Sequence, residues 1–99
     1  MLNIKKTTEN EKVCFQLEGR LDTITSPELE KQLLSALDHV KELVLDFEAL
    51  DYLSSAGLRV LLSTQKRMSR QGSMKLVHVN QTILDIFEVT GFSDILTIE

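Results

Sequence analysis

The 99-residue chain carries 11 basic and 15 acidic residues, for a formal net charge of −4, and 42% of its residues are hydrophobic. This length predicts one domain over residues 1–99, and the composition excludes a disordered chain. The lysines and arginines are scattered and no aromatic residues interleave with them, which argues against direct nucleic-acid binding.

Cysteine content and the N-terminus bear on redox chemistry and cellular location. Cys14 is the single cysteine, so we expect no internal disulfide and no metal-ligand cluster of the CxxC kind. We also expect no cofactor. Residues 1–6 lack the apolar run of a secretory signal, and no stretch approaches the ~20 apolar residues of a membrane span. The sequence therefore predicts a cytoplasmic protein that does not contact membranes.

The first segment of the chain predicts a hairpin at the edge of a sheet. Residues 12–18 alternate, with Val13, Phe15 and Leu17 on one face, and a shorter apolar segment precedes them across a polar turn. Gly19 is expected to end this strand.

A helix is predicted next. Thr25 or Ser26 offers an N-cap, and Pro27 is tolerated in a first turn that needs fewer amide donors. Apolar residues then recur at steps of three and four, namely Leu29, Leu33, Ala36, Leu37 and Val40. We expect the helix to end near residues 39–41.

The middle of the chain predicts a central strand and a long helix. Residues 42–47 are apolar on both faces of the pleat, which is typical of a strand covered by helices on both sides. After a loop through Asp51 and Tyr52, apolar residues follow a helical repeat over residues 55–71. Gly72 is expected to supply a left-handed stop.

The last part predicts a strand over residues 74–79, a short helix over 81–89 closed by Gly91, and a final strand over 95–98. Strands that alternate with helices need crossover connections. The predicted fold class is therefore α/β, with a mixed, mainly parallel sheet, an antiparallel edge hairpin and about three main helices.

The carboxyl ends of the parallel strands define a candidate functional edge, formed by residues 19–26, residues 48–56 and the region around Asn80. We expect Asp22, Thr23, Ser54 and Ser55 to share it. The two serines stand where a strand gives way to a helix, and the amides and dipole of a helix start favour an anion. A phosphorylated serine would therefore have local electrostatic support there.

Other interpretations of the serines stay open. Ser54 or Ser55 can simply cap the helix. Residues 53–57 also half resemble the G-x-S-x-G elbow, in which Ser55 would be a nucleophile. That chemistry needs a positioned base. His39 is expected near a helix end and His78 within a strand, so neither is evidently directed at the serines.

Four segments together resemble the STAS-domain family of anti-sigma factor antagonists: residues 18–22, 44–47, 52–62 and 89–92. The similarity covers essentially the whole chain, and its serine-glycine-leucine block is fairly specific when it follows a strand and opens a helix, as predicted here. The resemblance implies a single STAS-like domain that performs no catalysis itself.

The resemblance also implies a phosphorylation site. The accepting serine of the family lies two residues before the glycine of a D-S-[ST]-G-[LIV] motif, which places it at Ser55 when Gly57 and Leu58 anchor the register. Ser54 occupies the usual acidic position and Ala56 replaces the second hydroxyl residue. Ser54 is therefore the second choice as acceptor.

By the same resemblance, the partner is an anti-sigma factor with serine kinase activity, which binds the unphosphorylated chain and releases it on phosphorylation. A PP2C-like phosphatase resets the switch, and the free chain is expected to be a monomer. The implied partner-binding residues are Asp22, Thr23, Ser54, Ser55, Gly57, Leu58 and Arg59. The alternative is a sensory STAS module that binds a small ligand or nucleotide at the same edge.

Overall fold

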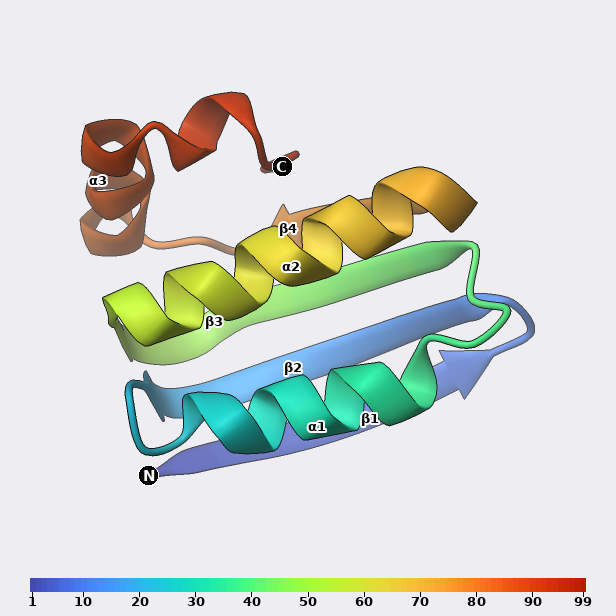
Figure 1. Cartoon of the computed structure of the whole chain (residues 1–99). Helices are drawn as coiled ribbons and strands as arrows, with labels where there is room; N and C mark the ends of the chain where they lie inside the picture. Colours follow the sequence, from blue (N-terminus) through green and yellow to red (C-terminus); the bar gives the residue numbers. More distant parts are fainter.

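The computed structural model describes residues 1–99 (Figure 1). Its elements are β1 (Leu2–Glu9), β2 (Lys12–Leu21), α1 (Ser26–Ala36), β3 (Glu42–Leu53), α2 (Ser55–Gln71), β4 (Ser73–Val77), α3 (Gln81–Thr90) and a 3₁₀ turn (Phe92–Asp94). The strands form one sheet in the order β1-β2-β3-β4, antiparallel between β1 and β2 and parallel elsewhere. The predicted α/β class and its edge hairpin are confirmed.

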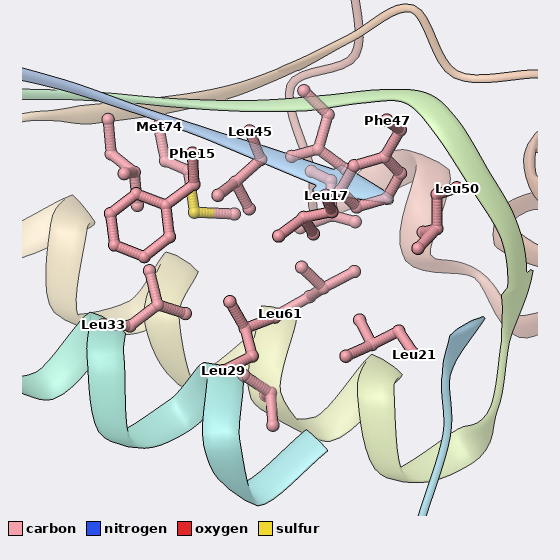
Figure 2. Close-up of a cluster of buried hydrophobic side chains, with 14 of the residues drawn as sticks. Phe15, Leu17, Leu21, Leu29, Leu33, Leu45, Phe47, Leu50, Leu61 and Met74 are labelled. Carbon is pink, nitrogen blue, oxygen red and sulfur yellow. The ribbon is translucent and has the colours of Figure 1, made fainter. Parts of the chain in front are cut away.

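The core lies between the sheet and the two longer helices, α1 and α2, which pack side by side on one face of the sheet (Figure 1). Figure 2 shows Leu29, Leu33 and Leu61 directed from the helices toward the strands, where they meet Phe15 and Leu45. The cluster contains 22 buried residues. Burial of each such side chain stabilises the fold by roughly 1.5–3 kcal/mol, so the strands and helices are held in a fixed arrangement.

The opposite face of the sheet carries no helix, so the prediction that helices cover both faces of residues 42–47 was wrong. Leu43 and Leu45 face the helices, whereas Val44 is buried outside the core cluster and Asp46 is half-buried. The apolar residue at position 44 made the strand resemble one covered on both sides.

The prediction that Gly19 ends its strand was wrong, because β2 continues through it to Leu21. Gly19 has a φ of +104°, a backbone angle that residues other than glycine rarely adopt. A Cβ there would also collide with the carbonyl oxygen of Met1. The register between β2 and β3 shifts between Gly19 and Arg20. The glycine therefore bends the strand and does not terminate it.

The loop predicted through Asp51 and Tyr52 is also part of a strand. β3 extends to Leu53, and Tyr52 pairs with Arg20 of β2. The register shifts place two consecutive exposed residues before each buried one, at positions 48–50 and again at 51–53. This spacing breaks the alternation by which a strand is predicted.

Two helix ends differ from expectation. α1 starts at Ser26 as predicted but ends at Ala36, and the buried Leu37 and Val40 lie beyond it in a turn where His39 has a φ of +66°. α2 has the predicted bounds. Gly72 after it is extended, with a φ of −178°, and it is required because a Cβ would collide with the backbone of Lys41.

The C-terminal segment forms a helix as predicted and only a trace of the final strand. α3 starts after Asn80, whose Oδ1 accepts a hydrogen bond from Ile83 N at 2.9 Å, and stops at the left-handed Gly91. β4 ends at Val77, two residues earlier than predicted, and Ile98 makes a single isolated bridge to Leu76 in place of a strand. None of the helices has both the length and the apolar character that crossing a bilayer requires.

Candidate functional site

The carboxyl ends of β2 and β3 meet at one edge of the sheet, where α1 and α2 both begin (Figure 1). Leu21 pairs with Leu53, and the backbone N–H of Ser54 donates to the Leu21 carbonyl at 2.9 Å. This pairing brings residues 22–25 beside the start of α2. We call residues 22–25, 54–56 and 59 the rim.

Ser54 is the N-cap of α2. Its backbone is extended, with φ −98° and ψ 174°, and its hydroxyl accepts a hydrogen bond from Gly57 N at 3.5 Å. Its carbonyl accepts the first helical bond, from Leu58 N at 3.0 Å. The capping interpretation therefore holds for Ser54.

Ser55 is the first residue within the helix, and its side chain is exposed. The first turn of α2 contains no acidic residue, so no carboxylate of the helix itself competes with an anion for the positive end of the helix dipole. Of the two adjacent hydroxyls, the one at Ser55 is the more accessible.

Gly57 and Leu58 are buried at the start of α2. A Cβ on Gly57 would lie 2.7 Å from Leu53 Cδ1 and 2.9 Å from Leu21 Cγ. The absence of a side chain therefore lets the helix approach the two strand ends closely. The structure gives this part of the serine block a packing role that holds Ser54 and Ser55 at the surface.

Asp22 organises the loop between β2 and α1. Its Oδ1 accepts hydrogen bonds from Ile24 N and Thr25 N, both at 3.0 Å, and Thr25 Oγ1 donates to the Arg20 carbonyl at 2.7 Å. The backbone N–H of Thr25, assisted by that of Ile24, holds the pKa of the Asp22 carboxyl below its usual value. These bonds order the loop in one conformation.

The sequence analysis missed two features, one within the rim and one beside it. Ile24 stands at the loop with 87% of its surface exposed, and the Arg20 guanidinium lies 4.1 Å above the ring of Tyr52. The exposure of Ile24 had one signal in the sequence, namely an aliphatic residue isolated among polar ones. The Arg20 and Tyr52 pair depends on the shifted register between β2 and β3.

Thr23 and Arg59 belong to the same surface. They line a shallow hollow of about 190 Å³ between the starts of α1 and α2, together with Ser26, Pro27, Glu30, Ala56 and Val60. Of the seven predicted partner-binding residues, the fold thus gathers Asp22, Thr23, Ser54, Ser55 and Arg59 at the surface of the rim.

The histidines do not supply a base for Ser55. His78 Nδ1 lies 3.0 Å from Asp46 Oδ1. That contact raises the pKa of His78 above its usual value. Asp46 stands between Leu45 and Phe47, which face the core, so strand alternation puts it on the face of the sheet away from α2. His39 lies in the turn after α1, at the end of the helix opposite to the rim. The nucleophile interpretation therefore has no support in the geometry.

The fold and the rim define a two-layer α/β domain that presents an exposed serine at a helix start beside an ordered loop. The STAS domain family matches residues 3–99, and the chain belongs to this family. The anti-sigma-B factor antagonist of Staphylococcus aureus is 30% identical over 97 residues, which cover 96% of this chain and 90% of that protein.

Solved structures show the same fold. An anti-sigma factor antagonist from Mycobacterium paratuberculosis superposes with a TM-score of 0.88 at 20% identity, over 99% of this chain and 85% of that one. The Bacillus cell fate determinant SpoIIAA in its phosphorylated form gives a TM-score of 0.75 at 19% identity, over 100% and 91% of the two chains.

Proposed function

We propose that this chain is an anti-sigma factor antagonist that acts by partner switching, with Ser55 as the phosphorylated residue. The observation that carries the proposal is the division of roles between the adjacent serines: Ser54 caps α2, and Ser55 is exposed beside the ordered loop of Asp22. The names of its relatives support the antagonist function. A phosphorylated form of SpoIIAA, which shares the fold, supports the modification.

In its unmodified form the chain docks through the rim onto an anti-sigma factor that has serine kinase activity. The kinase binds ATP, and the Ser55 hydroxyl attacks the γ-phosphorus. A bond forms between Ser55 Oγ and phosphorus while the bond to ADP breaks, and a base of the kinase takes the hydroxyl proton. In this proposal the chain is a substrate and a binding partner, not a catalyst.

Phosphorylation then weakens docking. The new group adds about −1.5 to −2 charges at one point of the rim. An interface that must desolvate this charge needs to lose only about 3 kcal/mol to bind roughly a hundredfold more weakly. The start of α2 tolerates the anion because its free amides and dipole favour it. The domain therefore stays folded while the partner leaves.

A separate PP2C-like phosphatase completes the cycle by removing the phosphate. We propose that the unbound chain is a monomer of one domain and that the cycle runs in the cytoplasm, where the kinase obtains ATP. These features follow from the family resemblance and complete the switching proposal.

The acceptor assignment is tested by intact-mass measurement after incubation with the cognate anti-sigma factor kinase and ATP. We expect one added phosphate on the wild type and none on Ser55→Ala. Ser54→Ala is the matched control and should still be modified, because it removes only the cap. Phosphate on Ser55→Ala, mapped to Ser54, would contradict the assignment.

The alternative, a sensor of small ligands or nucleotides at the rim, is less well supported by the surface. The hollow at Thr23 and Arg59, about 190 Å³, is smaller than the roughly 300–1,000 Å³ of small-molecule pockets. A neighbouring open hollow of about 430 Å³ is lined by Asp22 and Glu28, whose carboxylates oppose the phosphates of a nucleotide. Calorimetric titration with ATP and GTP, without a protein partner, is expected to show no binding.

A further inference from the structure

A compact group of metal-binding side chains lies on the uncovered face of the sheet. Asp46 and Glu48 come from β3, and His78 directly follows β4. One donor atom from each residue can be chosen so that all three lie within 4.8 Å of one another. His78 Nδ1 is 3.0 Å from Asp46 Oδ1 and 3.9 Å from Glu48 Oε2.

The backbone explains why these residues meet. β3 is irregular here, because its register against β2 shifts between the pairs formed by Asp46 and Ala49, and Glu48 N donates to Asp46 Oδ1 at 2.9 Å. On the other side, Asp46 pairs with Val77, so the next residue, His78, lies beside it. His78 has a φ of +56°, which ends β4 at this point.

The distances suit a bound ion. A metal that holds nitrogen and oxygen ligands at about 2.0–2.2 Å requires donor atoms roughly 3–4 Å apart. The two contacts of His78 Nδ1, at 3.0 and 3.9 Å, already lie in this range. Small rotations of the exposed Glu48 side chain are enough to close the set.

The donor types select the class of metal. Two carboxylates and a neutral imidazole offer two negative charges and one nitrogen, a set that suits first-row transition ions such as Zn²⁺ better than Mg²⁺ or Ca²⁺. Asp46 is 13% exposed in its side chain, and His78 and Glu48 are 59% and 77% exposed. Asp46 is therefore the fixed ligand, and water can complete the coordination from the open side.

The surroundings are acidic and accessible. A depression of about 470 Å³ runs along this face of the sheet and includes Asp46 and Glu48 in its lining. Glu18 adds a further carboxylate to it, and Lys5 is its one basic residue. The exposed side chains of His78 and Glu48 leave the site open to solvent.

We propose that Asp46, Glu48 and His78 bind a divalent first-row transition metal ion, with Zn²⁺ as the reference ion. The site lies on the face opposite to α1 and α2, so it is separate from the rim and does not depend on the proposed switching. Its ion joins β3 to the segment between β4 and α3. Metal binding is expected to stabilise the folded chain, because the unfolded chain does not hold these ligands together.

Isothermal titration of untagged, metal-stripped protein with ZnCl₂ tests the proposal. We expect saturable binding of one ion per chain and a rise in melting temperature. His78→Asn should weaken binding at least tenfold, since asparagine tolerates a left-handed backbone but removes the imidazole. His39→Asn is the matched control, because His39 is exposed and also has a positive φ of +66°. It should bind like the wild type.

Asp46→Asn provides a second test. The amide oxygen of asparagine can still accept the bond from Glu48 N, so the variant removes the charge and keeps the local geometry. It should lose Zn²⁺ affinity to a similar extent, with an unchanged circular dichroism spectrum. Addition of Mn²⁺ should also broaden the amide NMR signals of residues 46–48 and 78 selectively. Absence of saturable Zn²⁺ binding at millimolar concentration, or wild-type affinity in His78→Asn, would overturn the proposal.

Discussion

At the scale of single residues, two adjacent serine hydroxyls have different roles because they occupy different positions at the start of α2. Ser54 uses its hydroxyl to cap α2, and Ser55 keeps its hydroxyl at the surface. The family motif pointed to Ser55, but the sequence alone left open which serine was the cap. The backbone angles of Ser54 decide it.

The division of roles predicts different effects on stability. Ser54→Ala should lower the free energy of unfolding by about 0.5–1 kcal/mol, the lower part of the range for an N-cap, because the bond to Gly57 N is long at 3.5 Å. Ser55→Ala should change it by less than about 0.5 kcal/mol. Urea denaturation of both variants checks this, and equal losses would argue against the capping role.

Asp22 predicts a dependence of stability on pH. Its carboxyl has a lowered pKa in the folded state, mainly because Thr25 N donates to it. Its contribution is therefore complete above the unfolded pKa, about 3.9, and is lost as the pH falls through the lower folded value. The stability difference between wild type and Asp22→Asn should be largest near neutral pH and shrink on acidification. A difference that grows in acid would contradict the assignment.

At the scale of elements, α2 is the part of the chain that local pattern predicted best. Its bounds, Ser55–Gln71, agree with the helical repeat of apolar residues. The long strands were predicted less well. In β3, two pairs of exposed residues beside the register shifts imitate a loop, and in β2 the internal Gly19 imitates a strand end. A helix retains its period of 3.6 residues, whereas one irregularity changes the period of a strand.

The close approach of α2 to the strand ends predicts the cost of a small side chain. Gly57→Ala places a methyl group 2.7 Å from Leu53 Cδ1 and 2.9 Å from Leu21 Cγ, so it should destabilise the fold by about 1–3 kcal/mol. Arg59→Ala, an exposed change on the same helix, is the control and should cost less than about 0.5 kcal/mol. Thermal unfolding separates the two, and a neutral Gly57→Ala would show that the leucines move aside freely.

At the scale of the whole molecule, one helical layer covers one face of the sheet and leaves the other face bare. The two proposed sites therefore lie on different parts of the surface. The rim lies at the end of the sheet where α1 and α2 begin (Figure 1). The proposed metal site lies on the bare face, because Asp46 alternates along β3 with the core residues Leu45 and Phe47. α3 closes the remaining edge of the core through Phe87, whose ring centre is 6.5 Å from that of Phe47.

Because α3 packs on the core through Phe87, truncation of that side chain should cause a large loss of stability. Phe87 is fully buried, and Phe87→Ala should lower the free energy of unfolding by about 3–5 kcal/mol. This is a large part of the roughly 5–15 kcal/mol expected for a chain of this size. Val89→Ala on the same helix is the control, since Val89 is 87% exposed. Similar midpoints of urea unfolding for the two variants would contradict the packing of α3.

The sequence by itself determined the α/β class, the edge hairpin, the bounds of α2 and the serine block that relates the chain to its family. Each of these depends on the period of apolar residues or on a short motif, which are local properties. The tertiary structure decided which serine caps the helix, the exposure of Ile24 and the bare face of the sheet. It also brought His78 beside Asp46, which is 32 positions away in the chain. Such contacts depend on strand register, and register is set by the packing of the whole sheet.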